Sequence, residues 1–479
     1  MTEHSVKLFI NNEVKKDKRG TPTASSRPSR LTNPRPPAPV VDIPVAGRED
    51  VDAAVDAALA AFRHGPWTTA FSGAKRAACM LKLADLIEEN AAQLARLEGA
   101  AIGQPQAVGE VLVASCASAF RYYAGWADKI SGETYPADDG VYKLVRYEPL
   151  GVCAGIGSWN SSHMTFAWKA APALAAGNTV VYKSSEKSPL GLAALGPFIK
   201  RAGFPPGVIQ ILCGDGSTGE LLAAHMKVAK VSFTGSRAVG RMVQDAANRS
   251  NMKRCTLELG GKSPAIVFED APFDDAVNGC SSGILLNSGQ VCAATSRIYV
   301  QSGIADKFIS ALKASFQAVA PTIGPLADRT QFERVVKLIE AGKKEAELVT
   351  GGVGDSIAES GKELFVEPTL FANPQPGAAI LRQEIFGPVA TINVFDTEEE
   401  AVKLANDTEF GLSAAIYTES MARAIRVSSA LEAGTVGVNA PFFPSVQTAF
   451  GGYKQSGQGR ELGLSGILAY LQVKSIHIK

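Results

Sequence analysis

The chain has 479 residues, of which 46% are hydrophobic and 20% are charged, and its net charge is +1. A chain of this length exceeds one ordinary core, so two or more domains are expected. The near-neutral balance argues against a nucleic-acid partner, because phosphate binding needs concentrated basic charge. No apolar run approaches the roughly 20 residues that cross a bilayer, and the first residues lack the apolar core of a secretory signal. These features predict a soluble cytoplasmic protein with no membrane partner.

The seven cysteines and five histidines are dispersed along the chain. The cysteines show no close pairing such as Cys-x-x-Cys, and the histidines form no ligand cluster. This pattern predicts neither a disulfide framework nor a metal site. Most of the cysteines are expected to be small buried hydrophobic residues.

The first part of the chain is expected to be an arm followed by helices. Residues 15–40 are rich in Lys, Arg, Pro, Ser and Thr, which favours an extended surface arm. From residue 51 to 62, apolar residues recur at helical spacing. Further helical sequence is predicted over 74–89 and 91–127.

Between residues 152 and 261 short apolar runs alternate with helical segments. The five runs are 152–156, 179–182, 208–212, 228–233 and 255–259. The helical segments are 164–176, 190–202, 219–225 and 238–247. This alternation predicts a parallel α/β sheet, in which ligands bind beyond the carboxyl ends of the strands.

A second α/β pattern follows residue 261. Its predicted strands are 265–268, 298–300, 390–395 and 435–438, with helices near 304–319 and 328–341. We read it as a second domain, so the site is expected in the cleft between the two domains.

Two Gly-rich turns follow strands of the first pattern. Gly214-Asp215-Gly216-Ser217-Thr218-Gly219 has the spacing of a dinucleotide fingerprint, but the next strand ends without the acid that should bind ribose. A tight turn near a cofactor explains it more simply. The later turn, Thr234-Gly235-Ser236, also precedes a helix, and it is either a phosphate site or an ordinary helix cap by Ser236.

Lys183 and Glu186 follow another predicted strand. Lys183 could hold a ribose hydroxyl, and Glu186 could accept from the 2′- and 3′-hydroxyls. An acid there would repel a 2′-phosphate, which favours NAD, although NADP use stays possible. A solvated charge pair is the simpler alternative.

Three further residues suggest covalent chemistry. Cys292 lies in Asn287-Ser-Gly-Gln-Val-Cys292, and Glu258 lies 34 residues upstream in Leu257-Glu258-Leu259-Gly260-Gly261-Lys262. A thiolate can attack a carbonyl, and a carboxylate can later activate water. With Asn160 as an oxyanion donor, the set suggests oxidation of an aldehyde through a thioester. Taken alone, Cys292 would more simply be a buried thiol, Glu258 a turn carboxylate and Asn160 a cap.

Several segments together resemble the NAD(P)-dependent, non-acylating aldehyde dehydrogenases. They are Ser158-Trp-Asn160, Ala167 to Lys183, Phe233 to Ser236, Leu257 to Pro264, Gly289 to Cys292, Glu384 to Pro388 and Phe450 to Glu461. They occur in the family's order from about residue 45 to the C-terminus.

The resemblance implies a Rossmann-like parallel-sheet cofactor domain (1–125 and 150–259), an α/β catalytic domain (260–455) and a small β oligomerisation arm (126–149 and 462–479). The arm would combine a hairpin near 132–147 with a strand near 471–478 and give a homodimer or homotetramer. The implied cofactor contacts are Ile156, Trp159, Lys183, Glu186, Gly216, Gly235, Ser236 and Glu384. The candidate substrate walls are Ser161, Met164, Thr165, Trp168, Val291, Phe442, Phe443 and Phe450.

The chain departs from the family around Asn160. The family usually has proline before Trp-Asn and Phe-Pro after it, whereas this chain has Ser158 before and Ser161-Ser162 after. A wider and more polar substrate entrance is therefore expected. Residues 146–155 are similar to the betaine-aldehyde and aminoaldehyde branch, but aliphatic, aromatic and specialised biosynthetic aldehydes stay equally open.

Three other functions compete with this hypothesis. A CoA-acylating semialdehyde dehydrogenase would not need Glu258 to activate water. A thiol esterase would leave Lys183, Glu186 and Glu384 without a purpose. A catalytically inactive relative would not be expected to retain Cys292.

Overall fold

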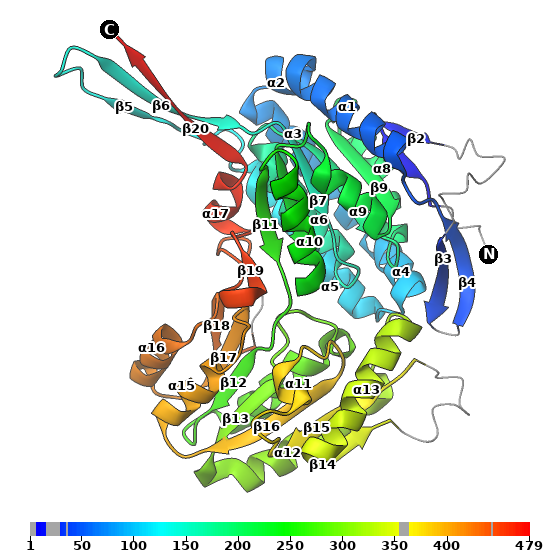
Figure 1. Ribbon diagram of the computed structural model, residues 1–479, viewed down its shortest axis with the longest axis vertical. Helices are drawn as coiled ribbons and strands as arrows, with labels where there is room; N and C mark the ends of the chain where they lie inside the picture. Colours follow the sequence, from blue (N-terminus) through cyan, green and yellow to red (C-terminus); the bar gives the residue numbers. More distant parts are fainter. Residues whose placement is uncertain (1–5, 16–28, 35–36, 354–363, 442–443) are drawn as a thin grey trace.

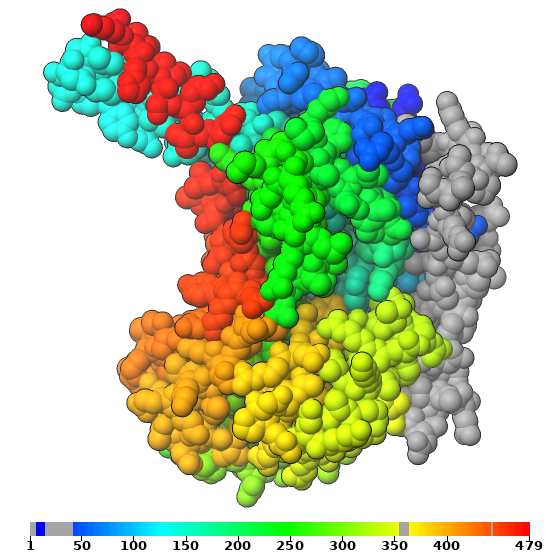
Figure 2. Space-filling model, in the orientation of Figure 1, coloured from blue at the N-terminus to red at the C-terminus, as the bar shows by residue number. Residues whose placement is uncertain are grey.

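The computed structural model describes residues 6–15, 29–34, 37–353, 364–441 and 444–479. Two large α/β sheets form the body, and a narrow three-stranded sheet projects from one end (Figure 1). In Figure 2 the projecting sheet stands clear of the body as an arm. The predicted fold class is confirmed.

The first sheet has the strand order β19-β11-β10-β7-β8-β9-β1-β2. Its five central strands are parallel, and they are the five that the apolar runs predict. Their bounds are β7 (Val152–Ile156), β8 (Thr179–Ser185), β9 (Ile209–Gly214), β10 (Lys230–Thr234) and β11 (Arg254–Glu258). The outer strands are β1 (Leu8–Ile10), β2 (Glu13–Lys15) and β19 (Gly457–Gln458). The sequence did not predict these outer strands.

Helices cover both faces of this sheet. One core cluster joins α3 (Gly73–Glu89), α5 (Gln106–Ala124) and α6 (Ser162–Ala175) to the strands, and a second joins α1 (Arg48–His64), α9 (Gly216–Ala224) and α10 (Arg237–Arg249). Neighbouring residues of β7 show how one strand serves both clusters. Cys153 packs in the first cluster, whereas Val152 and Ala154 pack in the second. Alternate strand residues point to opposite faces, so both faces of the sheet are buried.

Two predicted helices are interrupted. The helix expected over 91–127 is two helices, α4 (Ala91–Ile102) and α5, because Gly103 takes a left-handed conformation at φ 69° and ends α4. The helix expected over 190–202 is likewise split into α7 (Leu190–Ala193) and α8 (Gly196–Arg201). A short helix, α2 (Pro66–Thr69), lies between α1 and α3.

The N-terminal arm is in part a hairpin. Residues 16–28 and 35–36 lie outside the described ranges, and β3 (Ser29–Pro34) pairs with β4 (Pro37–Ile43) as a separate two-stranded sheet. Over residues 29–34 and 37–40 the expected extended conformation is confirmed, but the pairing was not predicted.

The second sheet has the order β14-β15-β16-β13-β12-β17-β18. The four predicted strands are β12 (Pro264–Val267), β13 (Arg297–Gln301), β16 (Val389–Phe395) and β18 (Thr435–Val438). The unpredicted strands are β14 (Glu347–Gly352), β15 (Glu367–Ala372) and β17 (Ser413–Tyr417). The covering helices are α11 (Phe273–Leu285), α12 (Ala305–Val319), α13 (Arg329–Glu345), α14 (Ala379–Arg382), α15 (Glu398–Asn406) and α16 (Met421–Ala430).

The projecting sheet has the order β20-β6-β5. Its strands are β5 (Glu133–Tyr135), β6 (Tyr142–Pro149) and β20 (Leu471–Ile478), which follows the short helix α17 (Gly463–Leu468). The predicted pairing of the hairpin with the C-terminal strand is confirmed. No helix in the described part of the chain is long and apolar enough to span a bilayer.

Candidate active site

A cavity of about 1280 Å³ lies between the two large sheets. The carboxyl ends of β7, β8, β10 and β11 open onto it, as parallel α/β sheets predict. Every described residue that the sequence suggested for catalysis, cofactor binding or substrate binding lines this cavity. Phe442 and Phe443, the other two predicted substrate walls, lie outside the described residues.

Cys292 follows a strained loop. Asn287 and Ser288 both take left-handed conformations, with φ of 50° and 58°, and Gly289 continues at 71°. Left-handed residues other than glycine cost of order 1 kcal/mol each, so the surrounding structure must hold them. Gly289 has no room for a side chain, because a Cβ there would lie 2.0 Å from the carbonyl oxygen of Gly387. This strain fixes the direction in which the loop presents Cys292.

The Gln290 side chain ties the same loop to its surroundings. Its Nε2 donates to the carbonyl oxygen of Asn287 at 3.1 Å, and its Oε1 accepts from the Ala327 N–H at 2.9 Å. The Ser288 hydroxyl donates to the carbonyl oxygen of Gly324 at 2.8 Å. The loop is thus anchored on the segment that precedes α13.

Burial raises the pKa of the Cys292 thiol to about 12, and the nearby Glu384 and Glu258 carboxyls act in the same direction. The backbone N–H groups of Ala293 and Cys292 lower this pKa but do not offset the burial. In the free protein the thiol is therefore protonated near neutral pH. A lowered thiol pKa, one of the two routes to activation considered from the sequence, does not operate here, so a base must take the proton.

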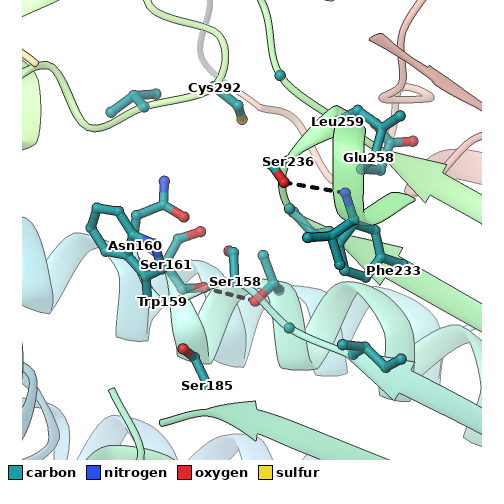
Figure 3. Close-up of a pocket in the computed structure, with 18 of the residues that line it drawn as sticks. Ser158, Trp159, Asn160, Ser161, Ser185, Phe233, Ser236, Glu258, Leu259 and Cys292 are labelled. Carbon is teal, nitrogen blue, oxygen red and sulfur yellow. Dashed lines mark hydrogen bonds between the residues drawn. The ribbon is translucent and has the colours of Figure 1, made fainter. Parts of the chain in front are cut away.

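Asn160 lies across a common space from Cys292, with Glu258 at the end of β11 (Figure 3). Its side-chain Nδ2 donates to the carbonyl oxygen of Gln290 at 2.9 Å. An amide nitrogen has two hydrogens, so one remains for a second acceptor. The side chain is thus held by the cysteine loop while keeping a free donor.

Two further side-chain amides, those of Gln104 and Asn287, donate to the backbone carbonyl oxygen of Asn160. The Nε2 of Gln104, between α4 and α5, donates to the Asn160 carbonyl oxygen and to the Asn287 Oδ1, both at 3.1 Å. The Asn287 Nδ2 donates to the same Asn160 oxygen at 3.4 Å. Sequence reasoning missed Gln104, because its partners lie far along the chain.

Glu258 is buried, and neither of its carboxyl oxygens has a hydrogen-bond partner among the described residues. Burial raises its pKa well above the usual value, and the neighbouring Glu461 raises it further. Gly451 makes room for the carboxyl, since a Cβ there would lie 2.8 Å from Glu258 Oε1. A carboxyl with a raised pKa is suited to general-base work near neutral pH.

A buried ion pair lies beside Glu258. Lys169 of α6 contacts Glu461 Oε1 at 2.8 Å and donates to Thr234 Oγ1 at 2.6 Å. The Ser232 hydroxyl also donates to Glu461 Oε1, at 2.9 Å. These groups were not singled out from the sequence. The signal that could have found them is a lysine in an otherwise apolar helix, because a buried lysine is almost always paired.

The turn after β11 is crowded from two sides. Glu384 accepts from the Gly261 N–H at 3.0 Å, and a Cβ on Gly260 would lie 2.3 Å from its Oε2. A Cβ on Gly261 would lie 2.4 Å from the Cys292 carbonyl oxygen. The two glycines therefore allow Glu384 and the cysteine loop to approach β11 closely. Burial raises the pKa of Glu384.

Lys183 and Glu186 lie close together at the end of β8, with Nζ 3.7 Å from Oε2. Burial lowers the pKa of Lys183, and Glu186 opposes that shift. The Lys183 side chain is buried, the Glu186 side chain is 33% exposed, and both residues line the cavity.

Both Gly-rich turns begin helices. Asp215 caps α9 by accepting from the Ser217 N–H at 2.9 Å, and Ser236 caps α10 by accepting from the Val239 N–H at 3.4 Å, which Figure 3 marks with a dashed line. The helix-cap alternative for Ser236 is confirmed, and Gly235 and Ser236 both line the cavity. A Cβ at Gly216 would meet nothing within 4 Å, so that turn is open.

The predicted substrate walls differ in character. Trp168 and Phe450 pack edge-to-face with ring centroids 5.1 Å apart. The Thr165 hydroxyl is already engaged with the Ser161 carbonyl oxygen at 3.1 Å and the Tyr182 hydroxyl at 3.2 Å. Met164 and Val291 complete the predicted apolar lining. Within the described ranges no group of three or more His, Cys, Asp or Glu side chains could hold a metal ion.

Comparison with known proteins identifies the family. The sequence profile of the aldehyde dehydrogenase family matches residues 21–476. The chain belongs to the aldehyde dehydrogenase family. This aldehyde dehydrogenase is 42% identical over 485 residues to human retinaldehyde dehydrogenase 3, covering 99% of this chain and 93% of the relative. It is 43% identical over 486 residues to an aldehyde dehydrogenase of Emericella nidulans, covering 100% and 96%.

Solved structures agree with these relatives. The aldehyde dehydrogenase KauB from Pseudomonas aeruginosa superposes with a TM-score of 0.94 at 37% identity, covering 99% of this chain and 97% of that one. An aldehyde dehydrogenase from Bacillus cereus in complex with NAD+ superposes with a TM-score of 0.93 at 37% identity, covering 99% and 96%. The family resemblance seen in the sequence motifs is confirmed over nearly the whole chain.

Proposed function

We propose that this aldehyde dehydrogenase oxidises an aldehyde to a carboxylic acid with NAD as the hydride acceptor, through a thioester on Cys292. The observation that carries the proposal is the convergence of Cys292, Asn160 and Glu258 on one cavity that continues along the carboxyl ends of a parallel sheet. The complex of a B. cereus relative with NAD+ supports the choice of cofactor.

The residues along the sheet fit a dinucleotide. The groove between α9 and α10 has apolar walls that would take a flat base, including Ala223, Val239 and Val243. The open turn at Gly216 and the N-terminal amides of α10 beyond Gly235 and Ser236 suit a pyrophosphate.

Acids and a lysine suit the two riboses. Lys183 and Glu186 would bind the adenine ribose, and Glu384 would bind the nicotinamide ribose. Ile156 and Trp159 would pack against the cofactor. When bound, the nicotinamide supplies a hydride acceptor. A preference for NADP over NAD would contradict the role given to Glu186.

Cys292 begins the reaction by attacking the aldehyde carbon. Because burial raises the pKa of this thiol to about 12, its proton must leave as the carbon–sulfur bond forms, and solvent water takes it. Glu258 therefore stays free to accept a proton in the later hydrolysis. The free N–H of the Asn160 side chain and the Cys292 backbone N–H stabilise the oxyanion. Losing one such donor typically costs about 10²–10³ in rate.

Loss of hydride from the adduct leaves an acyl group on Cys292. Glu258 then takes a proton from water, and the resulting hydroxide attacks the thioester to release the acid. The raised pKa of Glu258 makes its carboxylate a stronger base than an exposed one. In the buried pair beside it, Glu461 raises the pKa of Glu258 and Lys169 lowers it.

A panel of aldehydes tested for NADH formation, with Cys292→Ala and Glu258→Gln as variants, tests this function. Cys292→Ala is expected to form no NADH. Glu258→Gln is expected to give a burst of NADH followed by slow turnover, because acylation outpaces hydrolysis. Equal steady-state rates in Glu258→Gln and the unmodified protein would contradict the role of Glu258.

The same assay distinguishes the competing functions. Acceleration by CoA with formation of an acyl-CoA would indicate the CoA-acylating alternative, and ester hydrolysis without any NAD binding in calorimetry would indicate a thiol esterase.

We further propose a division of the chain that follows the three sheets. Residues 1–125 and 150–259 would form the cofactor domain, 260–455 the catalytic domain, and 126–149 with 462–479 the oligomerisation element. The exposed edge strands of the arm support a homodimer or homotetramer. We also propose that the protein is located in the cytoplasm.

A further inference from the structure

Two buried titratable side chains lie outside the cavity and have no role in the reaction described above. Glu98 of α4 is 2% exposed, and His163 in the first turn of α6 is 1% exposed. The Nδ1 of His163 lies 3.8 Å from the Oε1 of Glu98, and neither residue lines the cavity. Burying a carboxyl and an imidazole costs free energy unless they are paired, so this cluster calls for an explanation.

Gly191 allows α7 to close over the pair. A Cβ there would lie 2.3 Å from the His163 Cε1 and 2.5 Å from the Glu98 Oε1. The Glu98 Oε1 and the His163 Nε2 have no hydrogen-bond partner among the described residues, and in the same part of the chain no lysine or arginine pairs with Glu98. The acid and the imidazole are thus left to neutralise each other, which they do by holding one proton between them.

The surroundings of each group favour this state with one proton. Burial raises the pKa of Glu98 to about 8, although the nearby Ser162 hydroxyl and the Gly191 backbone lower it. Burial lowers the pKa of His163 to about 4, and the Gly191 backbone opposes that shift. The pair therefore holds one proton from about pH 4 to about pH 8.

Two other titratable side chains lie near the pair. Burial raises the pKa of Tyr182 in β8, and Cys116 and Glu98 act in the same direction. Burial also raises the pKa of Cys116 in α5. Both side chains stay uncharged at pH 9, so Glu98 is the group of this cluster whose charge changes between pH 7 and pH 9.

The pair is connected to Asn160 through both of its helices. Gln104, which follows α4, donates to the Asn160 carbonyl oxygen at 3.1 Å. His163 begins α6 just after Asn160 in the chain. A separation of α4 from α6 at Glu98 and His163 would therefore displace the backbone of Asn160, whose side chain supplies a donor to the oxyanion.

We propose that Glu98 and His163 are positioning residues for acylation, because the proton they share keeps α4 packed against α6 and so holds Asn160 at the cysteine loop. This inference rests on the proposed function and adds two residues to it. Loss of that proton leaves a buried carboxylate with no cation beside it, so water enters between the two helices. Asn160 then loses its alignment, and acylation slows.

Glu98→Gln tests the proposal, because it retains the size of the side chain and removes its titration. The NADH burst rate is measured from pH 6 to pH 9 in the variant and the unmodified protein, with saturating NAD and the aldehyde that is oxidised fastest. The ratio of the two rates cancels the titration of Cys292 and Glu258, which both proteins retain. This ratio is expected to be about tenfold higher at pH 9 than at pH 7, because an acid with a pKa of about 8 keeps its proton in about one molecule in ten at pH 9.

A second variant removes the same titration by another route. Glu98→Leu combined with His163→Leu replaces the buried pair with apolar side chains, and its ratio to the unmodified protein is expected to rise with pH by the same factor. Glu110→Gln on α5 is the matched control, since Glu110 is exposed and does not line the cavity. Its ratio is expected to stay within about twofold across the pH range.

A folded variant of either kind whose ratio is constant from pH 7 to pH 9 would overturn the positioning role, and aldehyde oxidation would stand. A changed melting temperature alone would not rescue it, because a purely structural pair does not alter the pH dependence of the burst. If the unmodified protein forms no NADH with any aldehyde, the proposed function is wrong, and this inference falls with it.

Discussion

Burial raises the pKa of both reacting side chains in the free protein. It raises the pKa of Cys292 to about 12 and the pKa of Glu258 well above its usual value. The thiol is therefore protected from unwanted reactions until substrate and cofactor are in place. The same burial makes Glu258 a strong base once it has lost its proton, so one physical cause serves both halves of the reaction.

The pH dependence of Cys292 alkylation tests whether the pKa of this thiol is raised. Only the thiolate reacts with iodoacetamide, so labelling of Cys292 in the free enzyme is expected to rise about tenfold per pH unit from pH 7 to 9 without a plateau. Mass spectrometry of the peptide that contains Cys292 measures the rate, and Cys292→Ala provides the blank. A plateau below pH 8 would show that the thiol pKa is low.

Short elements that lie far apart in the sequence position Asn160. Gln104 lies between α4 and α5, Asn160 lies before α6, and Asn287 lies in the cysteine loop. Three side-chain amides connect them within hydrogen-bond distance. These hydrogen bonds hold Asn160 against the cysteine loop from both its side chain and its backbone.

Gln104→Met removes the donor while retaining the size of the side chain. The rate of acylation, measured as the NADH burst, is expected to fall about tenfold because Asn160 loses its alignment, whereas NAD affinity stays within about twofold. Gln106→Met is the matched control, since Gln106 is exposed and its side chain donates to the Ala92 carbonyl oxygen and to Glu110. If Gln104→Met lowers the melting temperature but leaves the burst rate unchanged, the prediction is wrong and Gln104 only stabilises the fold.

Sequence patterns predicted the elements whose signals are local. The five central strands of the first sheet were readable because each contains an apolar run in a strand that is mostly buried. Strands β14, β15 and β17 were missed; β14 contains two register shifts against β15 and ends in glycines, which weakens its pattern. Cys292 and Glu258 were found through local motifs. Gln104 could not be, because only the folded chain brings its partners to it. Lys169 carried only the indirect signal of a lysine in an otherwise apolar helix, which does not name Glu461 as its partner.

At the scale of the whole molecule, the projecting arm is a three-stranded sheet whose two edge strands have no further neighbour among the described strands. In the arm, β5 and β20 are both edge strands, and Val473 of β20 is 60% exposed. Exposed edges of this kind pair readily with another chain. The arm projects away from the two large sheets in Figure 1, and no residue of β5, β6 or β20 lines the cavity. We therefore expect assembly and chemistry to be separable.

Val473→Asp tests the arm. Burying an unpaired carboxylate in an interface is costly, so the variant is expected to weaken self-association by roughly 100-fold. Sedimentation velocity measures the change from dimer or tetramer to monomer. Ile425→Asp on α16, where the side chain is 62% exposed, is the control and is expected to leave the mass unchanged. A monomeric unmodified protein would contradict the role of the arm.

Formation of a covalent bond at Cys292 during turnover is the central claim of this account. Glu258→Gln mixed with an oxidised aldehyde substrate and NAD, quenched with acid during the NADH burst, should show by intact-mass and peptide analysis one acyl group on Cys292 for each NADH formed. NADH formed in the burst with every Cys292 thiol unmodified would contradict it.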